Sequence, residues 1–173
     1  MRKRYLIAIF LLFSLLFTFT SCKKKDEGTK DITVQYCELG LVLSEGFESY
    51  DSGGAFDVAY YDGNAIVGMT RYSFVDCIEY GFLSTLDPEK FAEVHLQKTE
   101  KEGVEIFKDG DVPYYSYTLT NSSGGEYFYL LSFYRTPYAY FVVTFITPAE
   151  RSDEMKDVFL QYAKSAYIDG EYM

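Results

Sequence analysis

Two stretches of the chain, residues 127–134 and 138–146, are apolar at nearly every position. A strand with one face in water alternates apolar and polar residues, whereas a strand covered on both faces reads as a continuous apolar run. The first stretch is rich in aromatic residues and the second in aromatic and β-branched residues, and both kinds favour strands. They therefore predict two central strands of a sheet that has packed layers on both faces.

The end of the chain has a helical period instead. From Met155 to Ala166 the apolar residues recur at spacings of three and four, which places them on one face of a helix. That face comprises Met155, Val158, Phe159, Tyr162, Ala163 and Ala166. A second helix is predicted to begin at Asp87-Pro88-Glu89 and to end at Gly103, because Asp caps free amides and Pro suits the first helical position. The two helices can cover the sheet on opposite faces or share one.

Shorter strands and turns account for most of the remaining domain. Asp62-Gly63-Asn64 separates two strand-like runs, residues 55–61 and 65–72, and this pattern predicts a hairpin. Residues 73–85 fit a loop or a bent strand. The other predicted strands are residues 32–43, interrupted by Gly40, then 104–107 and 114–120. The fold class predicted is α+β, with a mostly antiparallel β-sheet of about six or seven strands flanked by helices.

The first 22 residues follow another pattern. A basic start at residues 2–4 precedes an apolar run at residues 5–20, which is shorter than the roughly 20 residues that a membrane-spanning helix needs. This is the anatomy of a secretory signal. The stretch ends in Thr20-Ser21-Cys22 and resembles a bacterial lipoprotein signal, although Phe19 stands where that family most often has leucine. The resemblance implies cleavage before Cys22 and a diacylglyceryl cysteine with acyl chains such as palmitate.

This reading divides the chain into three parts. Residues 1–21 are the signal peptide, residues 22–31 are the lipidated Cys22 with a flexible tether, and residues 32–173 form a single extracytoplasmic α+β domain. Two or more acyl chains anchor a protein stably, so the expected location is the periplasmic or cell-surface face of a bacterial membrane. An uncleaved anchor helix and secretion after cleavage elsewhere are the alternatives.

Charge and aromatic content narrow the classes of partner. The net charge of −10 disfavours nucleic acid, whose binding needs basic residues that neutralise phosphate. Aromatic residues make up 19% of the chain, and tyrosine is enriched at interfaces. The alternative is that these tyrosines pack across strands inside the sheet. The candidate partner or ligand surface comprises Tyr114, Tyr115, Tyr117, Arg135, Tyr138 and Tyr140.

Few residues suggest catalysis or metal binding. Cys37 and Cys77 are a candidate disulfide outside the cytoplasm, or else two small buried apolar residues. His95, the only histidine, has no neighbouring nucleophile motif, so a surface or half-buried role is favoured over a catalytic one. Aspartates such as Asp51, Asp109 and Asp111 are typical of turns, although they also suit calcium. We predict no catalytic residue, no metal and no cofactor.

The order of elements suggests a family. The segments "GLVLSEGFESY", "FDVAYYDGNAIVGMTRYSF" and "KSAYID" frame an arrangement over residues 32–169 that resembles the PsbP-like α/β/α sandwich. Members of that fold mostly act as binding or assembly partners, so the resemblance implies a non-catalytic binding or assembly domain with a protein or small-ligand partner. A lipoprotein that binds a small ligand (a sugar or a peptide) is the alternative, and a hydrolase is the weaker one.

Overall fold

The computed structural model describes residues 30–79, 81 and 83–169, so the predicted signal peptide and Cys22 lie outside the described residues. The strands are β1 (Ile32–Tyr36), β2 (Leu39–Leu43), β3 (Glu48–Ser49), β4 (Val58–Tyr61), β5 (Ile66–Ser73), β6 (Phe107–Asp109), β7 (Val112–Thr120), β8 (Glu126–Arg135), β9 (Ala139–Pro148) and β10 (Tyr167–Ile168). The helices are α2 (Phe74–Glu79), α3 (Pro88–Lys98) and α4 (Ser152–Lys164), with a 3-10 turn η1 (Ala149–Arg151) before α4. No helix within these described ranges is long and apolar enough to cross a membrane.

The strands form two antiparallel sheets. The larger has seven strands in the order β3-β4-β5-β9-β8-β7-β6, and the smaller has three in the order β1-β2-β10. β8 and β9 are the two continuous apolar runs of the sequence, and both lie inside the larger sheet with neighbours on each side. The α+β class and the central position predicted for these two strands are therefore confirmed.

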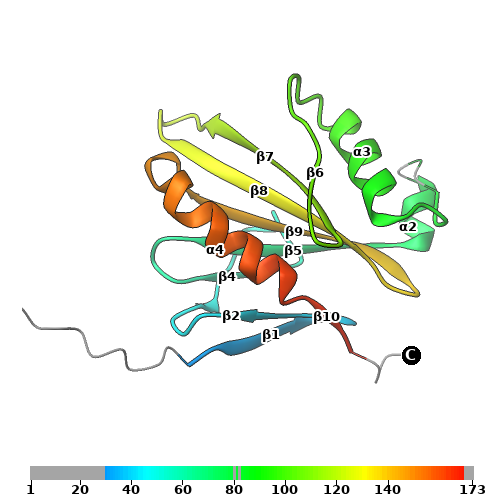
Figure 1. Cartoon of the computed structure of the whole chain (residues 1–173), viewed down its shortest axis with the longest axis horizontal. Coiled ribbons are helices and arrows are strands. Elements are labelled where there is room, and N and C mark those ends of the chain that lie inside the picture. The colour runs from blue at the N-terminus through cyan, green and yellow to red at the C-terminus, as the bar shows by residue number, and fades with distance from the viewer. Residues whose placement is uncertain (1–29, 80, 82, 170–173) are drawn as a thin grey trace, which may run out of the picture.

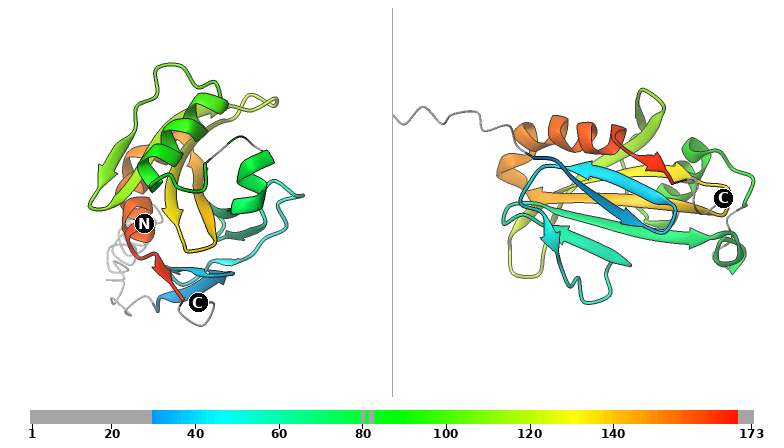
Figure 2. Two further views of the ribbon diagram at one scale, coloured as in Figure 1. Left: turned by 90° about the vertical axis from the view of Figure 1, so that its right-hand side faces the viewer. Right: turned by 90° about the horizontal axis from the view of Figure 1, so that it is seen from below.

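Two hydrophobic cores lie on opposite faces of the larger sheet. The first core lies under α4 and the small sheet, and contains Phe145 and Phe159 with centroids 5.2 Å apart. The second lies under α3, where the rings of Phe91 and Tyr140 stack 4.3 Å apart. Figure 1 shows α4 crossing in front of the larger sheet with the small sheet below it, and Figure 2 (left) shows α4 and α2 on opposite sides of β9. Both faces of β8 and β9 are covered because each side has a core of its own.

The helices follow most of the predicted signals. Asp87 caps α3 by accepting a hydrogen bond from the backbone amide of Lys90, at 2.8 Å. The predicted apolar face of α4 is confirmed, with Met155, Phe159 and Ala163 buried. α3 ends at Lys98 rather than near Gly103, because Glu100 adopts a left-handed backbone with φ of 51°. That conformation cannot continue a right-handed helix.

A short helix replaces the predicted loop or bent strand after β5. The hydroxyl of Ser73 accepts a hydrogen bond from the amide of Asp76 at 3.2 Å, and the Asp76 carboxylate accepts one from the amide of Ser73 at 3.0 Å. This reciprocal pair is a capping box, which satisfies free amides at the start of a helix. Ser73 and Asp76 stand at the spacing of that signal, so the prediction of a loop here was wrong.

The small sheet corrects a second prediction. Gly40 does not interrupt the first strand but lies inside β2, and the chain turns at Cys37, whose φ of 49° is left-handed. A Cβ atom on Gly40 would clash with Cζ of Tyr167. The glycine therefore leaves the space in which the ring of the β10 tyrosine packs against β2.

Candidate ligand-binding site

The six residues predicted as one surface are divided among three places. Tyr115 and Tyr140 are fully buried in the second core, and the Tyr140 hydroxyl donates to the backbone oxygens of Leu83 and Leu86. Tyr114 is buried on the opposite face, in the first core. For these three tyrosines the alternative of packing inside the sheet is correct, because each points into a core.

The other three predicted residues do not form one surface either. Tyr117 is half-buried on β7 and stacks on Tyr129 with centroids 5.2 Å apart. Arg135 and Tyr138 are exposed at the β8–β9 turn, where Arg135 lies 5.4 Å from the ring centroid of Phe74. The β8–β9 turn and the middle of β7 are far apart along the strands, so no single predicted cluster exists.

A hollow of about 350 Å³ gathers a different set of tyrosines. It lies at the end of the larger sheet that holds the β4–β5 turn and the last residues of β9. Its lining consists of Tyr50, Tyr61, Gly63, Asn64, Ile66, Tyr127, Ile146, Thr147 and Pro148. Among the described residues, none of those that line it carries a charge. The volume is within the usual range for small-ligand sites, roughly 300–1,000 Å³.

The strand register explains why these side chains meet. Tyr61 lies opposite Ile66, Ile66 lies opposite Ile146, and Ile146 lies opposite Tyr129. Residues opposite each other in antiparallel strands point to the same face. This row is on the same face as the second core, but beyond the part where α3 packs. The far end of that face is therefore left open, with an aliphatic floor and tyrosines around it.

The loop before β4 closes one side of this open face. A Cβ atom on Gly68 would clash with the ring of Phe56, so only a glycine at that position lets the Phe56 ring lie on β5. The Ser52 hydroxyl accepts a hydrogen bond from the amide of Phe56 at 3.1 Å. This folded loop separates the hollow from the second core.

The turn that forms the polar rim is held by its own hydrogen bonds. The Asp62 carboxylate accepts from the amides of Asn64 and Ala65 at 2.8 and 2.7 Å. The Tyr61 hydroxyl donates to the backbone oxygen of Gly63 at 2.7 Å, and the buried Thr147 hydroxyl donates to that of Asn64 at 3.3 Å. The predicted Asp62-Gly63-Asn64 hairpin is confirmed, and the Tyr61 ring is fixed at the edge of the hollow.

A second hollow, also of about 350 Å³, lies between the small sheet and the end of β8. Its lining is mostly apolar and comprises Leu39, Pro88, Asp111, Val112, Phe133, Tyr134, Arg135, Ala166, Tyr167 and Ile168. Arg135, a member of the predicted surface, lines this hollow. The polar side chains in its lining are those of Asp111, Tyr134, Arg135 and Tyr167.

His95 is enclosed by aromatic rings. Its Nδ1 atom lies 2.9 Å from the hydroxyl of Tyr115, and the centroid of Phe133 lies 5.3 Å from that of the imidazole. Burial lowers the pKa of His95 to about 4, and burial raises the pKa of Tyr115 far above its ordinary value. Near neutral pH the hydrogen bond therefore joins a neutral imidazole to a protonated phenol. This arrangement is half-buried, as the sequence favoured, and belongs to the second core.

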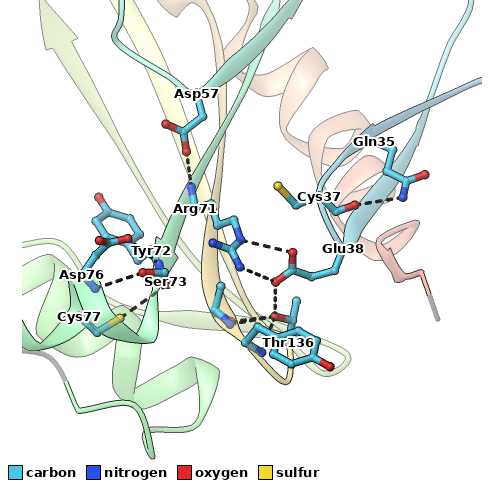
Figure 3. Close-up of polar contacts among 12 residues, drawn as sticks. Gln35, Cys37, Glu38, Asp57, Arg71, Tyr72, Ser73, Asp76, Cys77 and Thr136 are labelled. Carbon is cyan, nitrogen blue, oxygen red and sulfur yellow. Dashed lines mark hydrogen bonds and ion pairs between the residues drawn. The ribbon is translucent and has the colours of Figure 1, made fainter. Parts of the chain in front are cut away.

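A buried ion pair joins the two sheets (Figure 3). Both oxygens of the Glu38 carboxylate accept hydrogen bonds from Arg71 of β5, each at 3.3 Å. The hydroxyl of Thr136 donates to the same carboxylate at 2.9 Å. Burial alone would raise the pKa of Glu38, but hydrogen bonds from its backbone, Arg71 and Thr136 outweigh burial and lower it. The partners of Glu38 belong to β5 and to the β8–β9 turn, so these contacts hold the β1–β2 turn against the larger sheet.

The structure does not pair the two cysteines of the described chain. Both thiols are free, with Cys37 on the β1–β2 turn and Cys77 buried in α2. Figure 3 shows them on separate elements, on either side of Arg71. The Cys77 thiol instead donates to the backbone oxygen of Tyr72 at 3.7 Å. The proposed disulfide is therefore corrected to two free thiols, because the fold directs them to different layers.

The turn aspartates are occupied by structural contacts. Asp109 forms an ion pair with Lys164 at 2.9 Å, and Asp51 accepts a hydrogen bond from the amide of Gly53 at 2.9 Å. Within the described part of the chain, no group of three or more His, Cys, Asp or Glu side chains is placed to hold a metal ion. Asp51 therefore stabilises a turn, and Asp109 joins β6 to α4 through its ion pair.

Sequence reasoning missed the tyrosines of the first hollow. The sequence indicated the positions of two of them. Tyr61 directly precedes the hairpin turn, and Tyr127 stands two residues before Tyr129 and so points to the same face of β8. Nothing in the local pattern marks Tyr50, which reaches the hollow because β3 pairs with β4. Their meeting depends on the pairing of β5 with β9, which joins segments distant in sequence.

No family model matches the chain, and no curated protein matches it in sequence. Among solved structures, the chain is similar to a protein from Bacteroides thetaiotaomicron VPI-5482, with 10% identity and a TM-score of 0.54 over 84% of this chain. That match covers 50% of the Bacteroides protein, so the chain spans half its length. At this identity the likeness concerns the fold alone.

Two further solved structures are more distant. The chain is similar to cyanobacterial PsbP (CyanoP) from Synechocystis sp. PCC 6803, with 13% identity and a TM-score of 0.48, over 87% of this chain and 99% of that one. It is also similar to LpqN, involved in cell envelope biogenesis of Mycobacterium tuberculosis, with 9% identity and a TM-score of 0.41, over 83% and 92% of the two chains. Both TM-scores are below 0.5, so these two similarities support no conclusion about the family or function of this chain.

Proposed function

We propose that this chain is a lipid-anchored extracytoplasmic protein whose domain binds a ligand or partner and does not catalyse a reaction. The observation that carries the proposal is the convergence of Tyr50, Tyr61 and Tyr127, from three separate segments of the chain, on one hollow whose described lining residues carry no charge. Exposed aromatic side chains supply large contact areas at low entropic cost and are typical of binding sites.

The surroundings of His95 also favour binding over catalysis. A general base needs access to a substrate proton and a pKa near the working pH. His95 is surrounded by the rings of Phe91, Phe133 and Tyr115, and its pKa of about 4 lies far from neutral. The hollow and His95 lie at different ends of the same face, so the imidazole is not part of the candidate site.

The anchor rests on the sequence of residues 1–22, with Cys22 as the acylated residue. The charged residues within positions 1–21 are all basic, so removal of this segment makes the net charge of the remaining chain more negative. An acidic domain is repelled by anionic lipid headgroups. A tether after Cys22 would therefore hold the domain, with its tyrosine-lined hollow, away from the membrane surface.

The first test is the native mass of the protein, extracted from its own membranes in mild detergent. A chain that begins at Cys22 and carries acyl mass is expected, together with a bound species that Tyr61→Ala removes. A chain that begins near Met1 without acyl mass would contradict the anchor. A bound species that remains on the Tyr61→Ala variant would contradict the role of the hollow.

A further inference from the structure

We propose that the tyrosine-lined hollow binds a neutral saccharide, with one sugar ring held against the face of a tyrosine. This inference rests on the proposed function, because it names the ligand class of the same site. Its support comes from the ring geometry, the unused polar groups, the charge around the hollow and the shape of the sheet edge.

The side chains of Tyr50 and Tyr61 are partly exposed and lie against each other. Their centroids are 5.6 Å apart, the ring planes meet at 49°, and the residues are 43% and 41% exposed. The face of an aromatic ring is electron-rich and attracts positively polarised edges and C–H groups. A pyranose has one or two faces that consist of C–H groups, so it can lie flat against such a ring.

The polar groups of the hollow call for hydroxyl partners. Within the described part of the chain, the side-chain amide of Asn64 and the hydroxyls of Tyr50 and Tyr127 make no hydrogen bond to another residue. An apolar ligand that covered them would leave each unsatisfied, at a cost of roughly 1–3 kcal/mol per group. A sugar carries donors and acceptors around the rim of its ring, where these groups can bind them.

Charge favours a neutral ligand over an anionic one. The described residues that line the hollow carry no charge. Glu48 is the register partner of Tyr61, so it projects from the same face beside the hollow. With a net charge of −10, the chain repels phosphates and acidic sugars at longer range. A cation such as choline would be attracted, but it would leave the amide and the hydroxyls without partners.

The edge of the sheet argues against an extended peptide. Peptides that add a strand need a free edge long enough for several main-chain hydrogen bonds. The edge strand next to the hollow, β3, has two residues, Glu48 and Ser49, and the first is charged. Short charged edges resist strand addition. A compact ligand fits the site better, and about 350 Å³ is enough for a mono- or disaccharide.

The experiment is a titration of the full chain, purified in a detergent without a sugar headgroup. The probes are glucose, galactose, N-acetylglucosamine, maltose and cellobiose, with sorbitol as an open-chain control. Saturation-transfer NMR reports which ligand protons touch the protein. Intrinsic fluorescence reports the tyrosines directly, because the chain has no tryptophan. At least one ring saccharide is expected to bind through the C–H protons of one face, and sorbitol is expected not to bind.

Three variants locate the binding. Tyr61→Ala is expected to weaken the affinity about tenfold or more, which corresponds to about 1.4 kcal/mol, and Asn64→Ala is expected to weaken it by less. Tyr138→Ala is the matched control, because Tyr138 is 46% exposed at the opposite end of the β8–β9 hairpin. The Tyr138→Ala variant should bind the saccharide with the same affinity as the unchanged protein. Circular dichroism shows whether each variant is folded.

The outcomes separate this inference from the proposed function. If no saccharide binds, or if Tyr61→Ala binds it as well as the unchanged protein does, the saccharide assignment is overturned. Binding of choline or of a tripeptide mixture that depends on Tyr61, without saccharide binding, also overturns it but leaves a binding function at the hollow. If nothing binds in a Tyr61-dependent way, and the bound species from the native membrane is unaffected by Tyr61→Ala, both proposals fail.

Discussion

Replacing His95 by glutamine should change how the stability of the domain depends on pH. In the folded protein the pKa of His95 is lowered to about 4 by burial, whereas an unfolded histidine has an ordinary pKa near 6.5. The unfolded state therefore binds a proton between these values and the folded state does not. The free energy of unfolding contributed by this group is fully present above pH 6.5 and is lost as the pH falls towards 4.

The size of the effect follows from the two pKa values. Each unit of difference is worth about 1.4 kcal/mol, so the complete shift corresponds to about 3 kcal/mol. Between pH 7 and pH 5 the linkage relation gives a loss of about 2 kcal/mol. The carboxylates of the domain titrate in the unchanged protein and in His95→Gln alike. The difference between the two proteins therefore isolates the imidazole.

The assay is urea unfolding of both proteins at a series of pH values from 7 to 5, followed by circular dichroism. The unchanged protein should lose about 2 kcal/mol more than His95→Gln over this range. NMR gives an independent value, because the chain has one histidine and its imidazole signals need no assignment. An imidazole that titrates near pH 6.5 in the folded protein, or the same pH dependence in both proteins, would refute the burial argument.

Two further predictions concern the small sheet. Glu38→Gln should lower the free energy of unfolding near neutral pH by about 1–3 kcal/mol, because Arg71 loses a buried partner. The control is Glu93→Gln, which breaks the exposed pair with Lys90 and should have little effect in the same urea titration. Since the pKa of Glu38 is lowered, its contribution is present above the unfolded pKa and disappears as the pH falls through the folded value. Gly40→Ala should lower the free energy of unfolding by about 1–3 kcal/mol, because the added methyl group meets the ring of Tyr167. The loss should be smaller in a Tyr167→Ala background, and an equal loss in both backgrounds would contradict the contact.

Local patterns predicted the elements whose signals lie within a few residues. The continuous apolar runs of β8 and β9, the helical period from Met155 and the Asp87 cap all appear in the structure as expected. The capping box at Ser73 and Asp76 was equally local and was overlooked. A helix can therefore form in a stretch without a clear apolar period, because a capping box specifies where it begins.

Features that depend on distant pairing could not be predicted in this way. A tyrosine in a strand looks the same whether it points into a core, like Tyr115, or into a hollow, like Tyr61. The difference depends on how far α3 reaches along the face, and α3 ends where Glu100 turns left-handed. Likewise, Gly40 reads as a strand breaker until Tyr167 is known to pack on it.

The composition of the small sheet has a consequence for how the chain assembles over time. Its first two strands are adjacent in sequence and can pair as soon as they leave the ribosome or a membrane channel. Its third strand, β10, comes from the other end of the described chain, and pairs Tyr167 with Gly40. Contacts between such distant residues form late, because the loop between them must first be ordered. We therefore expect the β1–β2 hairpin to form early, with the β2 edge exposed until α4 has been made and has docked.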